Sequence, residues 1–277
     1  MLLLLAVASV LAADEPSLWT REAFGLGGWP TGILADARAQ VRTPLHRSDS
    51  MLFHNTFAGA GARILASPAF VEVGPRLSLS PIDVFDVELQ ASRAWYLPLK
   101  WSLMPFEEVG GKTMEARYER PEDAFGAGVW VVSVVPTVKL KLGHVVAFDS
   151  WTASYVRIDN PEGLDAPWVY EPFRDLLLAW EDVAFEHQAA AAWEFLPGGE
   201  RPLLWTGAAF RQRFALESPD RSWVLGPMVV FRASPSPWVP QAIGQCLFYL
   251  EDADRVGGVP NLQMLLAWVS DRPFGGD

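Results

Sequence analysis

The stretch VEVGPRLSLSPIDVFDVELQAS, residues 71–92, alternates between apolar and polar side chains at almost every position. Ser80-Pro81-Ile82-Asp83 interrupts this alternation and has the composition of a turn. Successive side chains of a strand point to opposite faces, so the stretch predicts a β-hairpin with one apolar and one charged face. The fold then depends on which of the two faces meets water.

The same alternation recurs along the chain and predicts about twelve strands, joined by turns rich in Gly, Pro, Ser and Asp. Many of them are ten to thirteen residues long, whereas an average strand has about five or six. A tilted strand needs about 9 to 11 residues to cross a bilayer, so the lengths favour a membrane barrel. The candidates are residues 33–42, 52–65, 71–80, 86–92, 130–141, 146–158, 168–177, 184–195, 203–216, 223–233, 238–250 and 261–270.

Tryptophan is frequent, with 13 residues in the chain. Many lie toward the ends of candidate strands, where the aromatic girdles of membrane barrels meet lipid headgroups. The alternative interpretation is that they fill a soluble core. The residues at strand ends are Trp95, Trp130, Trp193, Trp205, Trp223, Trp238 and Trp268.

In a soluble sandwich the charged face would be outside, whereas in a membrane barrel it lines the interior and the apolar face meets lipid. Strand length, strand number and tryptophan placement together predict the second arrangement: an all-β, up-and-down antiparallel transmembrane β-barrel of about 12 strands. Both charge signs occur on the inward face, so cross-strand pairing can neutralise the interior. The predicted lumen-lining residues are Asp36, Arg38, Arg42, Arg63, Glu72, Arg76, Asp86, Glu88, Lys139, Lys141, Arg211 and Arg213.

From about Ile33 onward the chain resembles bacterial outer-membrane β-barrel proteins, in its serial amphipathic strands and in the last strand, NLQMLLAWVSDRPF. The resemblance is to the class rather than to a particular family. It implies contact with outer-membrane lipid, insertion by the barrel assembly machinery and a location in the outer membrane of a Gram-negative bacterium.

Three features depart from that class. The chain continues past Phe274 as Gly275-Gly276-Asp277, whereas such barrels commonly end on an aromatic residue. Prolines inside candidate strands remove ladder donors, so some strands are expected to start, end or bulge there. Counted from residue 33, the longest loop, near 97–125, falls on the periplasmic side, where turns should be short. Either a strand is miscounted or residues 114–119 hide another one. The prolines concerned are Pro75, Pro136, Pro227 and Pro240.

The N-terminus carries an apolar run over residues 2–11, followed by Ala12-Ala13 and then polar residues. This pattern predicts a Sec-type signal peptide over residues 1–13 and a single barrel domain over residues 14–277. The usual positive charge ahead of the apolar run is missing, because the first basic residue is Arg21. Either the true start lies upstream, or the run is a short buried strand or helix in a soluble protein.

Charge and composition exclude two classes. The net charge of −11 argues against nucleic-acid binding, which needs a concentrated basic surface. No later stretch of eighteen apolar residues occurs, so helical membrane spans are not expected.

Residues suited to catalysis are few. His46 and Ser48 are two residues apart, as in outer-membrane lipid hydrolases, where a histidine deprotonates a serine nucleophile. The simpler interpretation is a polar loop, because no acid is placed by the sequence. No histidine has metal-ligand neighbours and no nucleotide fingerprint occurs, so neither a metal nor a cofactor is expected.

The sequence therefore predicts a non-catalytic outer-membrane barrel that acts as a narrow channel for small polar solutes or as a structural or binding scaffold. The first alternative is an outer-membrane lipid hydrolase that uses His46 and Ser48. The second is a soluble exported β-sandwich or ligand-binding barrel.

Overall fold

The computed structural model describes residues 17–27, 33–46, 56–100, 102–161, 164–197, 203–234, 239, 241–252 and 260–270. The expected signal peptide, residues 1–13, lies outside these ranges. Within them, no helix is both long and apolar enough to cross a membrane.

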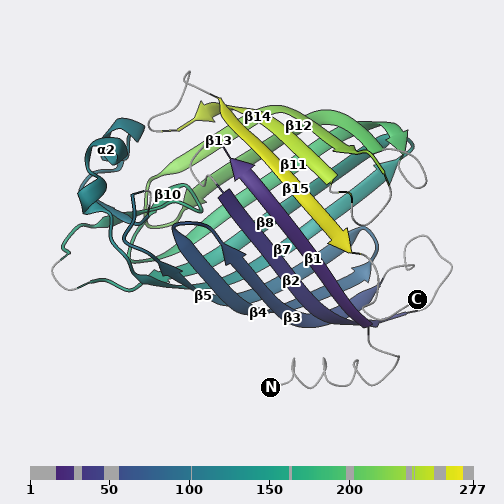
Figure 1. The fold of residues 1–277 in the computed structure, drawn as a ribbon, viewed down its shortest axis with the longest axis horizontal. Helices are drawn as coiled ribbons and strands as arrows, with labels where there is room; N and C mark the ends of the chain where they lie inside the picture. Colours follow the sequence, from purple (N-terminus) through teal and green to yellow (C-terminus); the bar gives the residue numbers. More distant parts are fainter. Residues whose placement is uncertain are drawn as a thin grey trace.

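Twelve strands form one closed antiparallel barrel in which strands consecutive along the chain pair with each other (Figure 1). The first strand pairs with the last, from Thr20 opposite Ser270 to Gly27 opposite Gln263, and this pairing closes the sheet. The predicted all-β, up-and-down antiparallel barrel of about 12 strands is confirmed. Its strands are β1 (Ser17–Gly27), β2 (Ile33–Pro44), β3 (Phe57–Ala66), β4 (Phe70–Ile82), β5 (Phe85–Tyr96), β7 (Gly128–Leu142), β8 (Val145–Ile158), β11 (Glu181–Pro197), β12 (Leu203–Ala215), β13 (Arg221–Arg232), β14 (Gln241–Glu251) and β15 (Asn261–Ser270).

The predicted strand count was right, but two assignments were wrong and compensated for each other. Residues 17–27 form β1, which the alternation did not reveal, and residues 168–177 lie outside the barrel wall. With β1 included, the long connection after β5 falls at the end of the barrel opposite the start of β1 and the end of β15. We call these the far end and the terminal end. The expected strand at residues 114–119 is the helix α2 (Met114–Glu119).

The hairpin β4–β5 has its charged face inside the barrel. Glu72 and Arg76 are buried, while Val71 and Val73 on the opposite face of the same strand are about 40% exposed (42% and 39%). The remaining outward face is largely apolar, and Val132 reaches 54% exposure. A charged interior with an apolar exterior is the reverse of a soluble sandwich and is what lipid contact requires.

Of the tryptophans expected in the girdle, the structure describes the side chains of five, and four of these lie near strand ends on the outer face. Trp95 and Trp130 lie at the far end and Trp193 near the terminal end, each about half exposed (52%, 52% and 49%). Trp205 is the exception, because it faces the interior, where its indole Nε1 donates to Glu194 Oε1 at 3.2 Å. Trp238 and the side chain of Trp268 lie outside the described residues.

The prolines do not end or bulge their strands, contrary to expectation. Pro75 pairs with Ala62, Pro136 with Val87 and Pro227 with Ala208, and the register is the same on both sides of each. Each proline is paired across one neighbouring strand and has no partner across the other. The strand therefore continues through it, and the missing donor interrupts one ladder locally. Pro240 lies outside the described residues.

The two long connections at the far end, within residues 97–127 and 159–180, fold together into what we call the cap. A small sheet in the order β10–β9–β6 forms its centre, and Figure 1 shows α2 and β10 at that end of the barrel. Leu103, Val169, Leu176 and Leu178 of the cap pack in one cluster with inward barrel residues such as Val131. The cap elements are β6 (Met104–Phe106), η1 (Val109–Gly111), α2, η2 (Pro121–Asp123), β9 (Trp168–Glu171) and β10 (Leu176–Leu178).

Polar contacts fix the cap to both sides of the barrel. Lys112 Nζ lies 2.6 Å from Asp220 Oδ1, in the turn between β12 and β13, and both side chains are fully buried. Asp220 Oδ2 also accepts from the backbone N–H of Leu177 at 2.8 Å. On the other side, the Tyr96 hydroxyl of β5 donates to Glu171 of β9. The cap is therefore an ordered part of the fold rather than a surface loop.

Candidate functional site

Cavities of about 690, 670 and 570 Å³ lie inside the barrel, between residues that the structure describes. The first two share Arg38 and Lys139 among their lining residues, and the last two share Phe173 and Arg213. The cavities are thus neighbouring parts of one lumen. The 690 Å³ cavity reaches Ser17 at the terminal end of the barrel.

One side of this lumen is a network of opposite charges, which we call the charged wall. Asp36 accepts from Arg38 at 2.7 Å and from Arg63 at 2.9 Å. Arg63 also donates to Gln90 Oε1 at 3.3 Å, and Gln90 in turn donates to Glu72 at 2.9 Å. Alternation places every one of these residues on the inward face of its strand. The wall consists of Asp36, Arg38, Arg63, Glu72, Arg76, Asp86, Glu88 and Lys139.

The rest of the charged wall is also paired. Arg76 and Arg38 both approach Glu88, the latter at 3.9 Å, and Lys139 forms an ion pair with Asp86. Four acidic and four basic residues balance across these strands, so the wall presents little net charge to the lumen. The acidic and basic side chains of the charged wall therefore neutralise each other's charge, which is a structural role.

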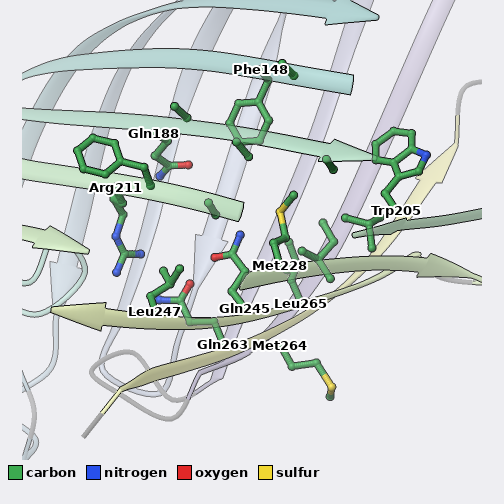
Figure 2. A pocket seen from close by; sticks show the side chains of 18 of the residues that line it. Phe148, Gln188, Trp205, Arg211, Met228, Gln245, Leu247, Gln263, Met264 and Leu265 are labelled. Atoms are coloured by element: carbon green, nitrogen blue, oxygen red, sulfur yellow. The ribbon is translucent and has the colours of Figure 1, made fainter. Parts of the chain in front are cut away.

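The opposite side, the apolar wall, has a different composition. Its inward residues come from β11 to β15 and surround the 570 Å³ cavity shown in Figure 2. Small side chains on β11 and β12, together with Gly207, leave room for this space. The apolar wall consists of Ala190, Ala192, Ala209, Met228, Val230, Ile243, Leu247 and Leu265.

Polar side chains interrupt the apolar wall at a few positions. Arg213 pairs with Glu186, which also accepts from Gln188. Arg211 lines the same cavity but makes no hydrogen bond or ion pair with any residue that the structure describes. Figure 2 shows Arg211 at this cavity together with Gln188 and Gln245. The guanidinium of Arg211 therefore has donors available to something inside the lumen.

The tip of the β9–β10 hairpin enters the lumen from the cap. Phe173 and Arg174 line the 670 Å³ cavity. Glu171 holds this tip, because its carboxylate accepts from the backbone N–H of Phe173 at 2.9 Å and from Arg174 Nη1 at 2.9 Å. Asp175, at φ 55°, supplies the left-handed residue that turns the chain back. The tip thus obstructs part of the lumen near the far end.

Ten of the twelve residues expected in the lumen line its cavities. The other two are Asp36, bonded to Arg38 and Arg63, and Lys141, which pairs with Glu194 at 2.9 Å. Arg42 lies over the rings of Trp19 and Phe57 at 4.5 and 4.3 Å. Sequence reasoning missed the glutamines of the apolar wall, because neutral residues carry no charge signal on an alternating strand. It also missed Phe173, which lies at the tip of the cap hairpin outside the barrel wall.

Among the residues that it describes, the structure does not show a catalytic site at His46 and Ser48, the pair considered for a lipid hydrolase. His46 is exposed just after β2, and its carbonyl accepts from Thr56 at 3.2 Å. Ser48 lies outside the described residues. Within the described part of the chain, no group of three or more His, Cys, Asp or Glu residues is arranged to hold a metal ion.

A polar pair on the outer face was also missed. His187 Nε2 lies 2.6 Å from Asp149 Oδ1 across β11 and β8. The ring of His187 stacks on Trp151 with centroids 4.0 Å apart, and Phe210 approaches its other side edge-on at 5.5 Å. The aromatic rings therefore cover much of a polar group that faces away from the lumen.

Comparisons with known proteins add little to this description. No family model matches the chain, and no curated protein matches it. Among solved structures, the translocator domain of autotransporter NalP from Neisseria meningitidis is similar, with 10% identity, 95% of this chain and 91% of that chain covered, and a TM-score of 0.34. That score is too low to support a conclusion about function. The class-level resemblance to outer-membrane β-barrels rests on the strand pairing and the two faces of this chain.

Proposed function

We propose that the protein is a non-catalytic β-barrel of the outer membrane of a Gram-negative bacterium, exported by a signal peptide within residues 1–13. It provides a narrow passage for small polar solutes, and the cap restricts that passage at the far end. The observation that supports this role is the position of the β9–β10 tip, where Phe173 and Arg174 stand among lumen-lining residues.

The barrel size is consistent with this role. Eight strands are filled by their own side chains, and sixteen to eighteen leave an aqueous channel. Twelve strands fall between these limits, so an internal segment can decide whether solutes pass. The charged wall lies opposite the apolar wall, so a polar solute in passage would turn its charged or polar groups toward the charged wall.

Planar-bilayer conductance tests the proposal. The intact protein is compared with a variant in which a short Gly-Ser linker replaces residues 164–178 and removes the hairpin. We expect low conductance from the intact protein and a several-fold increase from the variant, because the obstruction has gone. Absence of conductance in both proteins, each shown to be folded by a heat-modifiable mobility on a gel, would overturn the channel.

Location is tested separately by fractionation. We expect the full chain in the outer-membrane fraction, with a requirement for detergent to stay in solution. Recovery in the soluble fraction without detergent would support the exported soluble barrel instead.

A further inference from the structure

Arg211 is the feature of the lumen that the channel proposal does not explain. Its neighbour Arg213 has Glu186 as an ion-pair partner, and Glu186 is further engaged by Gln188. Arg211 forms no hydrogen bond or ion pair with a described residue, and the carboxylates of Glu186 and Asp175 act on it only from beyond contact distance. A guanidinium in a partly desolvated, apolar setting carries an energetic cost unless an anion accompanies it. The arrangement therefore favours a negatively charged occupant.

The surroundings of Arg211 indicate the rest of that occupant. From Arg211 toward the terminal end, the inward residues of β12 are Ala209, Gly207 and Trp205. Their cross-strand neighbours are Ala190 and Ala192 on β11, with Met228 and Val230 on β13. This apolar strip extends over six residues of β12, or about 20 Å at the usual rise of a strand.

The side chains that line the strip are small, which leaves the cavity open beside them. Gly207 itself cannot be enlarged without moving the strand, because a Cβ there would lie 2.0 Å from the backbone oxygen of Ala191. The cavity of about 570 Å³ falls within the usual range of small-molecule sites, roughly 300–1,000 Å³. A long, thin, apolar body matches this shape better than a compact polar solute.

Polar groups border the strip on one side. Gln245 and Gln263 are directly opposite each other on β14 and β15, next to Met228 on β13. These amides favour water along the β14–β15 side. The hydrocarbon chain of a bound molecule would therefore lie against β11, β12 and β13, where alanine side chains and Met228 shield it from water.

We propose that this strip binds an amphipathic organic carboxylate, with the carboxylate on Arg211 and the hydrocarbon chain along Ala209, Met228 and Val230 toward Trp205. One guanidinium matches one singly charged head, because its planar donors bind a carboxylate in a bidentate manner. The inference deepens the proposed function by naming a class of solute, and it rests on that proposal for entry of the solute into the lumen.

Decanoate serves as the probe, titrated calorimetrically into the full-length protein in lipid nanodiscs, with empty nanodiscs as the partition background. We expect saturable binding of decanoate above that background. Acetate, which lacks the chain, and decyltrimethylammonium, which reverses the charge, should not bind saturably. Saturable binding of either control compound with the affinity of decanoate would overturn the site.

Two variants locate the binding on the structure. Arg211→Gln should weaken decanoate binding by about tenfold to a hundredfold, the loss expected for one charge-assisted interaction. Ala209→Trp keeps the charge but fills the strip, and should also abolish binding. Arg157→Gln removes an exposed arginine of β8 and serves as the matched control, with binding unchanged. Each variant is first shown to be folded by its heat-modifiable mobility.

The failures of the two proposals are distinguishable. Unchanged decanoate affinity in Arg211→Gln or in Ala209→Trp would overturn the site, whatever the conductance. A lack of conductance in the hairpin-deletion protein, together with Arg211-dependent binding, would overturn the passage and leave a lumen that binds its ligand without transporting it.

Discussion

The two walls of the lumen use inward-facing side chains in opposite ways. On the charged wall, Asp36 is bonded to both Arg38 and Arg63, and the neighbouring strands add further pairs. On the apolar wall, alanines, Met228 and Val230 alternate with a few polar groups, and Arg211 has no partner among the described residues. Both walls have the same backbone geometry, so the difference comes from the sequence alone.

This difference separates structural from functional roles of interior charge. A paired network stabilises the barrel and leaves few donors available to a solute. An arginine without a partner contributes little to stability and keeps its donors available. Three comparisons test this distinction, beginning with the contact that fixes the cap above the apolar wall.

Loss of the Lys112 ammonium should have the largest effect. In Lys112→Met, Asp220 remains fully buried beside the apolar wall without its cation, which costs about 3–5 kcal/mol of unfolding free energy. Urea unfolding of the reconstituted protein measures the loss. Arg120→Met is the matched control, since its pair with Asp123 is exposed and is worth about 0–1 kcal/mol. Equal losses in the two variants would contradict a buried anchor.

Breaking the charged wall should have an intermediate effect. Asp36→Asn leaves Arg38 and Arg63 facing each other without their shared carboxylate. We expect a loss of about 2 kcal/mol, reduced from the fully buried case because lumen water reaches these side chains. Arg211→Gln on the apolar wall should lower stability by no more than about 0.5 kcal/mol, because it removes a charge that no bonded partner compensates. Both are measured by urea unfolding, and a larger loss in Arg211→Gln would remove the distinction between the walls.

Acidification should produce the smallest effect, at the same cap anchor. Burial raises the pKa of Asp220 above its ordinary value of 3.8, although Lys112 and the Leu177 N–H act in the opposite direction. The carboxyl group of Asp220 therefore binds a proton more tightly in the native protein than in the unfolded chain. The resulting stabilisation is fully present below pH 3.8 and is lost as the pH rises through the raised pKa.

The comparison of wild type with Asp220→Asn isolates this effect, because the amide does not titrate. As the pH falls from neutrality toward 3.8, the wild type should gain unfolding free energy relative to the variant. Urea midpoints at several pH values measure the difference. A relative loss by the wild type on acidification would show that the pKa of Asp220 is lowered rather than raised.

Much of the barrel could be predicted from the sequence because alternation is a local property. Glu72 and Arg76 share one face of their strand by parity, and strand length then identifies that face as the inner one. The pattern failed at β1, where Arg21 and Glu22 stand next to each other and interrupt the alternation. It also failed at residues 168–177, where apolar residues suggested a wall strand although the chain reverses at Asp175.

The candidate site was less accessible to sequence reasoning. That Arg211 faces the lumen follows from its position on an alternating strand. The lack of a bonded partner for Arg211 does not follow from the alternation. It depends on the pairing of β11 with β12, which places Glu186 opposite Arg213 and Gln188 opposite Arg211. The entry of Phe173 into the lumen depends in turn on how two distant connections pack together. Such contacts are set by tertiary structure rather than by local pattern.

Closure of the sheet between β1 and β15 imposes an order of assembly. Thr20 meets Ser270 across this seam, so the wall stays open until almost the entire chain has been made. The cap belongs to the middle of the chain and packs against inward barrel residues, so all of its residues precede the last strand in the sequence. The step that pairs β15 with β1 therefore comes when the residues of the cap have already been synthesised.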